Sequence, residues 1–449
     1  MKRTIKEQAV IFVSVVKWAL LATVVGIVAG AATTFFVKSL NWGYGLSGLK
    51  YYFLLIPLGL VASALIGRYL MPEGHGADKA IETIHKATAK IRAKAVPVEF
   101  ITTFLTITSG GSAGKEGPAA QIGAGLASLV ADAFRLKGAD RRKLAICGIS
   151  SGFASVFGTP IAGAIFGIEV MFAGRMLYDV MLPSFIAGII SYQVSSYLGL
   201  SYFYNPITIV PVFSELFFLK VAVAGVFFGL CSILFIETLN AARRLSERSG
   251  LNLFIKGILA GGLLIGLTFL FTDRYLGLGI ETIETALKGG RVEWYAFLLK
   301  PVFTGITLGF GGHGGIGTPV FFVGAAAGNA LSRVLNVDPA MLSAIGFVAL
   351  LAGAANTPIA ASIMAIELFG AEIAPYAAVA SVISFIISGH RSAYASQIVF
   401  VKKSASIEVE LGSEIGKATP TYQTREDSWI YFFKQALSRI LRGKNRGGP

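Results

Sequence analysis

The sequence predicts an all-α integral membrane protein built from two related halves with broken helices. Hydrophobic residues make up 54% of the 449 residues and charged residues 14%, whereas a typical soluble domain carries roughly 25% charged residues. The apolar residues gather in blocks long enough to cross a ~30 Å hydrocarbon core as helices. Two glycine- and proline-containing segments also occur twice along the chain. These observations exclude a typical water-soluble enzyme.

The apolar blocks predict membrane-spanning helices, and the clearest of them run from Ala9 to Val37, from Tyr51 to Met71 and from Phe213 to Ile236. The first block is too long for a cleaved signal peptide and many others follow it, so we expect the mature chain to begin at residue 1. The net charge is +14, and the basic residues lie mostly between the blocks and in the tails. That distribution follows the positive-inside rule rather than the pattern of a nucleic-acid surface. We therefore expect a multi-pass protein of the cell membrane with both termini in the cytoplasm and no nucleic-acid partner.

The two cysteines, Cys147 and Cys231, both lie inside apolar segments. This placement predicts neither a disulfide framework nor a metal cluster. We expect no cofactor and no metal ion, and the only bound species that we expect is a transported ion.

The apolar pattern ends at about Val401, so residues 1–401 are predicted to form the transmembrane domain and residues 402–449 a basic cytoplasmic tail. Within this tail, residues 429–442 mix aromatic and basic side chains at roughly helical spacing. An amphipathic helix there could lie on an anionic membrane leaflet. A helix docked on the protein's own surface is the alternative.

An internal repeat accounts for the helix breaks. The segment Gly110–Gly125 aligns with Gly311–Ala326, and the segment Gly158–Glu169 aligns with Asn356–Glu367 at nearly the same offset. We therefore predict a first repeat over about residues 1–200 and a second over about 210–400. Helix breaks at corresponding positions of two halves indicate an ion-binding site at the interface of the repeats.

Glu116 is the residue in these breaks with the clearest chemical role. A carboxylate inside the membrane costs several kcal/mol unless it is paired, neutralised or facing water, so it is treated as functional by default. The glycines beside it allow backbone N–H groups to converge where a helix begins, which predicts an anion site formed by Gly114, Lys115 and Gly117. Protonation of Glu116 would remove a competitor of the anion, so we interpret it as a gate that can also carry a proton. A helix cap or a solvated loop residue is the alternative.

Other segments offer similar features for binding an anion. The second repeat has the same glycine-rich entry into a helix but no carboxylate, and a third glycine-wrapped helix start includes a histidine. A tyrosine after the final apolar block could donate a hydrogen bond to a buried anion, although an interfacial tyrosine is the ordinary alternative. The candidate anion-binding residues of these segments are Ile316, Gly317, Thr318, His75, Gly76 and Tyr394.

Together these motifs resemble the CLC family of chloride channels and proton-coupled chloride exchangers over about residues 70–400. Residues Gly114–Pro118 are similar to the family's GKEGP or GREGP motif, whose glutamate is the external gate. Residues Gly74–Gly76 stand where the family commonly has GSGIP, and Gly315–Pro319 stand where it has GIFAP. Tyr394 stands at the position of the tyrosine that coordinates the central anion. The resemblance implies two inverted-topology repeats of tilted and broken helices, assembled as a homodimer with one pore per subunit.

Three departures from the family pattern bear on mechanism. His75 replaces a serine that caps the central chloride, where an imidazole could donate a hydrogen bond or merely fill the space. Gly317 replaces a bulky phenylalanine, which could widen the pore. Val170 follows Glu169 where proton-coupled members often have a second glutamate, and a valine cannot relay a proton. We expect Glu169 and its repeat counterpart Glu367 to be structural carboxylates that are paired or cap helix ends, perhaps at the subunit interface.

The leading hypothesis from the sequence is passive conduction of chloride or a similar monovalent anion through a pore that Glu116 gates. Anion/proton exchange, with Glu116 as the external proton carrier, is the alternative within the same family. Fluoride transport is a further alternative, because helix N-termini favour negative charge without specifying the anion. An enzyme is not expected, since the four histidines form no HExxH-type metal motif.

Overall fold

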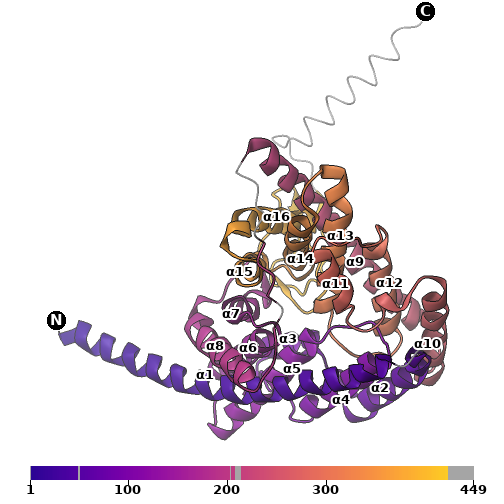
Figure 1. Ribbon diagram of the computed structural model, residues 1–449. Helices are drawn as coiled ribbons and strands as arrows, with labels where there is room; N and C mark the ends of the chain where they lie inside the picture. The colour runs from indigo at the N-terminus through magenta and orange to yellow at the C-terminus, as the bar shows by residue number, and fades with distance from the viewer. Residues whose placement is uncertain (1, 49–50, 203, 208–213, 423–449) are drawn as a thin grey trace, which may run out of the picture.

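The computed structural model describes residues 2–48, 51–202, 204–207 and 214–422, and these residues form sixteen α-helices and four short strands (Figure 1). The prediction of an all-α protein is therefore confirmed. Four helical segments are long and apolar enough to cross a membrane, and they begin at Lys6, Tyr52, Glu215 and Leu253. Three of them coincide with the apolar blocks expected from the sequence.

The helices of the first half are α1 (Lys2–Gly43), α2 (Ile56–Leu70), α3 (Ala77–His85), α4 (Ala95–Thr108), α5 (Glu116–Ala133), α6 (Gly138–Phe157), α7 (Pro160–Glu169) and α8 (Met181–Tyr197). Those of the second half are α9 (Glu215–Arg248), α10 (Leu253–Leu270), α11 (Ile280–Leu287), α12 (Ala296–Gly309), α13 (Gly317–Leu335), α14 (Pro339–Ala355), α15 (Pro358–Phe369) and α16 (Ala374–Ile387). Short 3-10 helices are η1 (Tyr44–Gly48), η2 (Tyr52–Leu55), η3 (Tyr178–Val180), η4 (Asp273–Tyr275) and η5 (Ala371–Ile373). The strands are β1 (Phe172–Ala173), β2 (Ile398–Val399), β3 (Ile407–Glu408) and β4 (Thr421–Tyr422).

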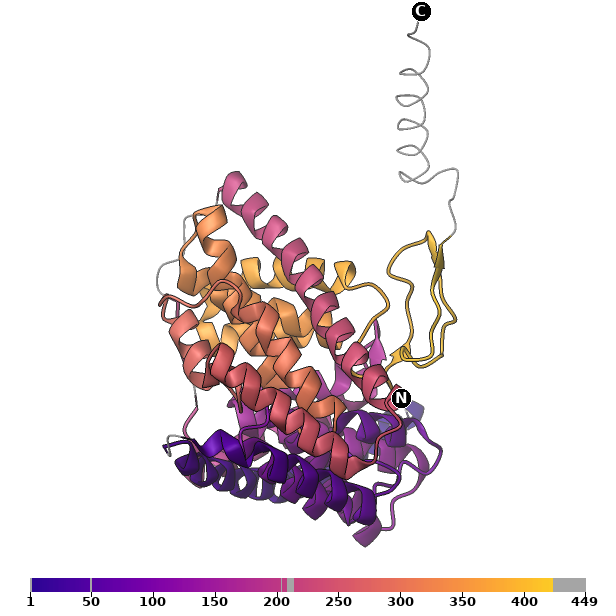
Figure 2. The same cartoon turned by 90° about the vertical axis from the view of Figure 1, so that its right-hand side faces the viewer.

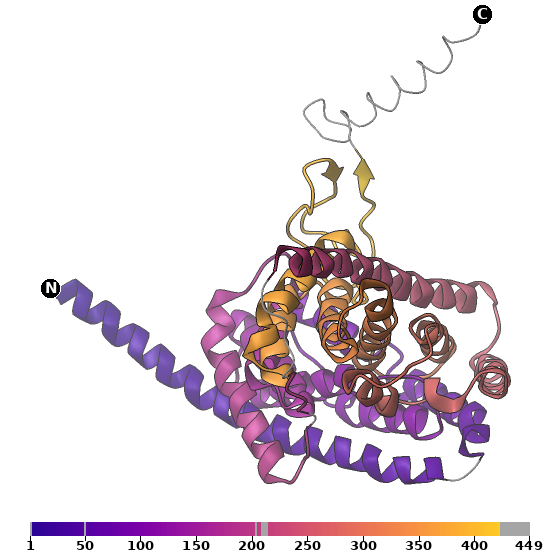
Figure 3. The ribbon, with the colours of Figure 1, turned by 45° about the horizontal axis from the view of Figure 1, so that its top comes forward.

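Helix α1 has 42 residues, which is about 63 Å of helix and well beyond the thickness of a hydrocarbon core. Its C-terminal part packs along α8. Its N-terminal part extends away from the helical body (Figures 1 and 3), and there it exposes apolar side chains such as Phe12 and Val13.

The breaks predicted from the repeat are present in both halves. Helices α6 and α14 are followed directly by Gly158 and Asn356, which adopt left-handed conformations with φ of 72° and 55°. Glycine and asparagine tolerate this conformation, and it terminates a helix. A proline two residues later then begins the next helix, α7 at Pro160 and α15 at Pro358, where its missing N–H costs nothing.

Glycines allow equivalent helix pairs to pack at close range in the two halves. A Cβ atom on Gly123 of α5 would lie 2.1 Å from the carbonyl oxygen of Gly148 in α6. A Cβ atom on Gly324 of α13 would lie 2.2 Å from the carbonyl oxygen of Gly346 in α14. Backbone contact through small residues is the usual way in which helices associate in a membrane, where no hydrophobic driving force acts between them.

The two halves are inverted relative to each other. Gly114 and Gly315 are equivalent residues of the repeat, and they form an antiparallel bridge with reciprocal N–H to C=O distances of 2.6 and 2.7 Å. Equivalent segments therefore run in opposite directions where the halves meet. The bridge also joins the loop that precedes α5 directly to the loop that precedes α13.

The chain after α16 folds back onto the first half. Strand β2 pairs in parallel with β1, and the following chain runs beside the helical body as loops that contain the antiparallel pair β3 and β4 (Figure 2). The side chain of Lys403 donates hydrogen bonds to Asn356 Oδ1 at 2.6 Å and to Ser388 Oγ at 3.1 Å. The predicted amphipathic helix at residues 429–442 lies outside the described residues.

Candidate functional site

The starting ends of three helices meet at the bridge between the two halves. A Cβ atom on Gly117, in the first turn of α5, would lie 2.9 Å from Gly315 Cα and 3.5 Å from Ala77 Cβ. Gly315 lies two residues before the start of α13, and Ala77 is the first residue of α3. The backbone N–H groups of the first turn of a helix have no partner within that helix, so this junction is suited to a negative charge.

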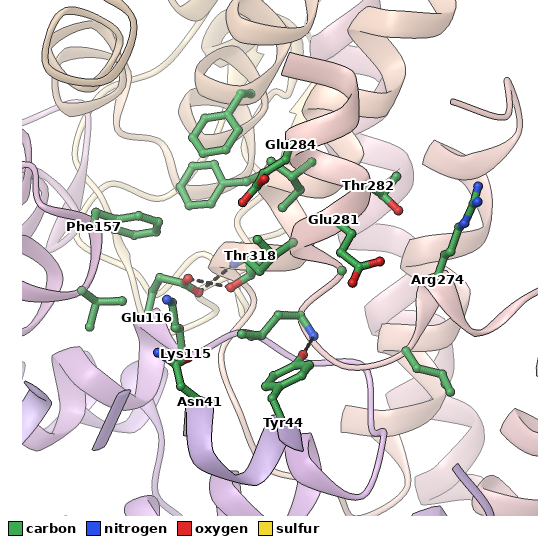
Figure 4. A pocket seen from close by; sticks show the side chains of 18 of the residues that line it. Asn41, Tyr44, Lys115, Glu116, Phe157, Arg274, Glu281, Thr282, Glu284 and Thr318 are labelled. Carbon is green, nitrogen blue, oxygen red and sulfur yellow. Dashed lines mark hydrogen bonds between the residues drawn. The ribbon is translucent and has the colours of Figure 1, made fainter. Parts of the chain in front are cut away.

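Glu116 provides the negative charge at this junction. Glu116 is 2% exposed. Its carboxylate accepts hydrogen bonds from the Thr318 N–H at 2.7 Å and from the Thr318 hydroxyl at 2.6 Å (Figure 4). The first residues of α5 and α13 are thereby joined across the two halves. The carboxylate uses two donors that an anion bound at the start of α13 would also need.

Two glycines give the carboxylate its space. A Cβ atom would lie 2.6 Å from Glu116 Oε2 if placed on Gly114 and 2.8 Å if placed on Gly317. Both distances are too short for a real side-chain contact. The absence of a side chain at Gly317 therefore leaves space for the Glu116 carboxylate beside Thr318.

A cavity of about 630 Å³ lies on one side of the junction. Lys115, Glu116 and Thr318 line it where the repeats meet, and aromatic side chains such as Phe157 form another part of the wall. Figure 4 shows Glu281 and Glu284 of α11 reaching toward the same space, with Arg274 further away. The acidic residues of α11 were not found from the sequence, because no motif connects them to Glu116.

Two buried polar contacts hold the cavity wall around Leu278. The Leu278 N–H donates a hydrogen bond to the Tyr44 hydroxyl, which comes from the segment after α1. The ammonium group of Lys300 in α12 is fully buried and donates to the carbonyl oxygens of Tyr275 at 3.0 Å and Gly277 at 2.9 Å. The wall is therefore fixed by residues from both halves.

Tyr394 and Ile316 lie close to the junction but outside the large cavity. Tyr394 is 6% exposed, and the N–H of Ser396, two residues later, donates a hydrogen bond to Asp78 Oδ1 at 2.8 Å near the start of α3. Ile316 lines a separate small cavity of about 40 Å³ together with Arg243 and with Ala393, the residue that precedes Tyr394. The structure thus places Ile316, and the residue next to Tyr394, at a second and smaller cavity.

His75 and Gly76 precede the third helix start, but the imidazole of His75 turns away from the cavity. Its Nδ1 atom contacts Glu99 Oε2, and its ring stacks on that of His313 with 4.3 Å between the ring centroids. Gly76 has φ of 104°, a conformation that favours glycine. Our sequence reasoning missed Glu99 and His313 as partners of His75. The available signal was the carboxylate of Glu99 inside an otherwise apolar helix.

Comparisons with known proteins show which proteins this chain is similar to. A family model described as voltage gated chloride channel matches residues 58–389. The chain is 39% identical over 420 residues to a protein of Pseudomonas syringae pv. tomato named chloride/fluoride channel protein, with 88% of this chain and 89% of the relative covered. It is 31% identical over 305 residues to the voltage-gated ClC-type chloride channel ClcB of Shigella flexneri, with 65% of this chain and 72% of the relative covered.

Solved structures have the same fold. A CLC-type fluoride/proton antiporter matches with a TM-score of 0.82 at 27% sequence identity, covering 86% of this chain and 98% of the antiporter chain. A slow cyanobacterial Cl⁻/H⁺ antiporter matches with a TM-score of 0.71 at 20% identity, covering 83% of this chain and 94% of the other, which supports the fold alone. The resemblance noted in the sequence is confirmed: this chain belongs to the voltage gated chloride channel family, whose members are anion-transporting membrane proteins and not enzymes.

Proposed function

We propose that this protein exchanges a small halide ion for protons and that Glu116 is both the gate and the proton carrier. The observation that supports this most directly is the pair of hydrogen bonds from Thr318 to the Glu116 carboxylate. The carboxylate and an anion compete for the same donors at the start of α13. Protonation removes the charge of Glu116 and releases it toward the cavity, and the anion then takes its place.

Fluoride is the first halide to test, with chloride beside it. The Pseudomonas syringae relative is named for both ions, and the antiporter with the TM-score of 0.82 is named for fluoride. The first residues of α13 offer a backbone N–H and a hydroxyl on Thr318, and these donors do not by themselves distinguish the two anions. We propose that the only bound ligand is a transported anion. Its site includes Gly114, Lys115 and Gly117 of the first repeat and residues 316–318 of the second.

Passive conduction is the second candidate, and Val170 favours it. Val170 has no titratable group at the position where proton-coupled relatives often have a second glutamate, and it is 1% exposed. A channel needs only the movement of Glu116 out of the pathway. An exchanger needs a second proton acceptor on the far side of the junction.

The test is simultaneous recording of halide and proton movement in liposomes that contain the purified full-length protein. Wild type is compared with Glu116→Gln, which keeps the size of the side chain and cannot exchange a proton, and with the control Glu410→Gln at an exposed carboxylate. We expect wild type and the control to move protons against the halide. We expect Glu116→Gln to move the halide without protons.

Three results would overturn parts of this proposal. A wild-type reversal potential that stays at the equilibrium value of the halide under a pH gradient identifies a passive channel. Proton movement by Glu116→Gln at the wild-type rate removes Glu116 from the proton pathway. A reversal potential that does not shift when a fluoride gradient is imposed excludes fluoride as a substrate.

We also propose that the protein is a homodimer with one pathway per subunit and that both termini lie in the cytoplasm. Helices α7, α8, α15 and α16 pack against one another. They expose apolar side chains such as Ile189, Ile366 and Ile386 on the surface of this group. Cross-linking of cysteines that replace Ile366 in two copies would test the homodimer. Labelling of cysteines placed at the two ends of the chain with a membrane-impermeant reagent would test the location of the termini.

A further inference from the structure

A buried group of titratable side chains lies apart from the large cavity. The side chains of His75, in the loop before α3, and of Glu99, in α4, are each 1% exposed and contact each other through Nδ1 and Oε2. The ring of His313, from the loop before α13, lies against the His75 ring with an angle of 20° between the ring planes. An imidazole, its carboxylate partner and a second imidazole are thus contributed by both repeats.

Hydroxyl groups surround the second imidazole. His313 Nδ1 lies 2.9 Å from Ser63 Oγ, and the His313 N–H donates to the Thr106 hydroxyl at 3.0 Å. The Thr106 hydroxyl in turn donates to Ser63 Oγ at 3.0 Å. Besides the His75 ring, the partners of His313 are therefore uncharged hydroxyl groups. The carboxylate of Glu99 contacts His75.

One ring nitrogen of the group is left open. Among the residues that the structure describes, His75 Nε2 has no hydrogen-bond partner. It faces the backbone of α2, where a Cβ atom on Gly67 would lie 2.9 Å from His75 Nε2 and 2.9 Å from His313 Nε2. A buried polar atom without a partner costs about 1–3 kcal/mol. Nε2 is therefore the ring nitrogen of His75 that is left to accept a further proton.

The group lies away from the cavity, toward another face of the protein. Tyr52, just before α2, lines the cavity, and Gly67 follows the start of α2 at Ile56 by about 16 Å of helix. Glu73 and Gly74, next to His75 in the chain, are exposed. The buried side chain of His75 is thus preceded in the chain by exposed residues, and it is followed by α3, whose first residue lies near Gly117.

We propose that His75 and Glu99 form the second proton-binding site of the exchanger, on the side of the junction opposite to the cavity. This inference rests on the proposed exchange of halide for protons. Protonated Glu116 loses its proton and returns to Thr318 as a carboxylate. The proton adds to His75 Nε2, and the resulting imidazolium is stabilised by the Glu99 carboxylate until it releases the proton to water near Gly74.

The charges around His75 are suited to this role. From α4 it faces the Glu99 carboxylate, and from the loop before α13 it faces the His313 ring. From α2 it faces the backbone of Gly67, and the neighbouring Arg68 is exposed. A single proton on the group therefore converts a net charge of −1 into zero. This site would supply the acceptor that Val170 cannot provide.

The test uses the full-length protein in liposomes, with halide and proton movement recorded together. The variants are Glu99→Gln and His75→Gln. The matched control is His85→Gln, because His85 lies in α3 and its Nε2 contacts the Met171 carbonyl oxygen outside this group. We expect both variants to keep halide movement within about twofold of wild type and to lose at least tenfold in proton movement, while the control keeps both.

A double variant, His75→Met with Glu99→Leu, guards against loss of folding, because apolar residues of similar volume often replace a buried ion pair without loss of stability. It should also move the halide without protons. Unchanged proton-to-halide ratios in the variants overturn the second site and leave the exchange intact. An equal loss of both fluxes assigns the pair to the anion pathway or to folding and also overturns it. Absence of proton movement in wild type overturns the exchange itself.

Discussion

Glu169, at the end of α7, caps the start of α15, and Glu367, near the end of α15, caps the start of α7. The carboxylate of Glu169, the last residue of α7, accepts hydrogen bonds from the N–H groups of Ile359 and Ala360 at 3.1 and 2.8 Å, at the start of α15. The carboxylate of Glu367, near the end of α15, accepts from Ile161 and Ala162 at 2.9 and 2.8 Å, at the start of α7. The prediction that these residues are structural carboxylates near helix ends is confirmed.

Loss of either cap is expected to destabilise the protein. Glu169→Ala should lower the free energy of unfolding by about 2 kcal/mol, because two buried N–H groups lose a charged acceptor. Glu169→Gln should cost less, since one amide oxygen still accepts. Thermal unfolding of the purified protein in detergent measures the effect, with Glu410→Ala as the exposed control. A Glu169→Ala variant as stable as the control would contradict the capping role.

The hydroxyl of Thr318 is expected to hold the gate closed. Thr318→Val removes the 2.6 Å hydrogen bond to Glu116 Oε1 and keeps the backbone N–H. A hydrogen bond to a charged group contributes about 1.5–3 kcal/mol, so the fraction of released Glu116 should rise by about tenfold or more. Halide flux at neutral pH should therefore increase in Thr318→Val, whereas Thr318→Ser should behave like wild type. If both variants have the wild-type rate, the hydroxyl does not control the gate.

The absence of a side chain at Gly317 is expected to be necessary for closure. In Gly317→Ala the new Cβ atom would lie 2.8 Å from Glu116 Oε2 and 3.1 Å from Glu116 Cβ, so the carboxylate must leave Thr318. We expect faster halide movement that depends less on pH. Gly262→Ala is the control, because no atom lies within 4 Å of its new Cβ atom. A Gly317→Ala variant that keeps the wild-type pH dependence would show that Glu116 closes the pathway from another position.

Lys300 is expected to maintain the cavity wall. Lys300→Met removes both hydrogen bonds to the carbonyl oxygens of Tyr275 and Gly277 and leaves these oxygens without that donor. The cost should be about 1–3 kcal/mol for each oxygen that stays buried and unpaired. Thermal unfolding in detergent checks this loss. Lys402→Met, at a partly exposed ion pair with Glu408, should change stability by less than about 1 kcal/mol.

Much of the fold could be predicted because its causes are local. The long apolar blocks predict helices that cross the membrane, and the repeated glycine and proline segments predict where helices break. Glu116 could be recognised because an unpaired carboxylate in an apolar segment is too costly to be incidental. The structure places Glu116 in the first turn of α5, where the glycine-rich segment predicted the start of a helix.

The contacts between the halves could not be predicted in the same way. The donor to Glu116 is Thr318, 202 residues away in the chain, and the sequence identified both residues without showing that they bind each other. The sequence presented His75 as an anion ligand, whereas the structure turns its ring onto Glu99 and His313. The side on which an imidazole packs depends on the helices that surround it and not on the glycines beside it.

The sequence by itself determined the class of the protein and the positions of the helix breaks, and it drew attention to the carboxylate of Glu116. These follow from the cost of placing polar groups in hydrocarbon, and that cost acts on each segment separately. The tertiary structure decided how the halves are inverted, which donor Glu116 uses and which side chains surround His75. Those features arise only when the starts of distant helices meet, because unsatisfied backbone and side-chain groups find their partners across the interface between the repeats.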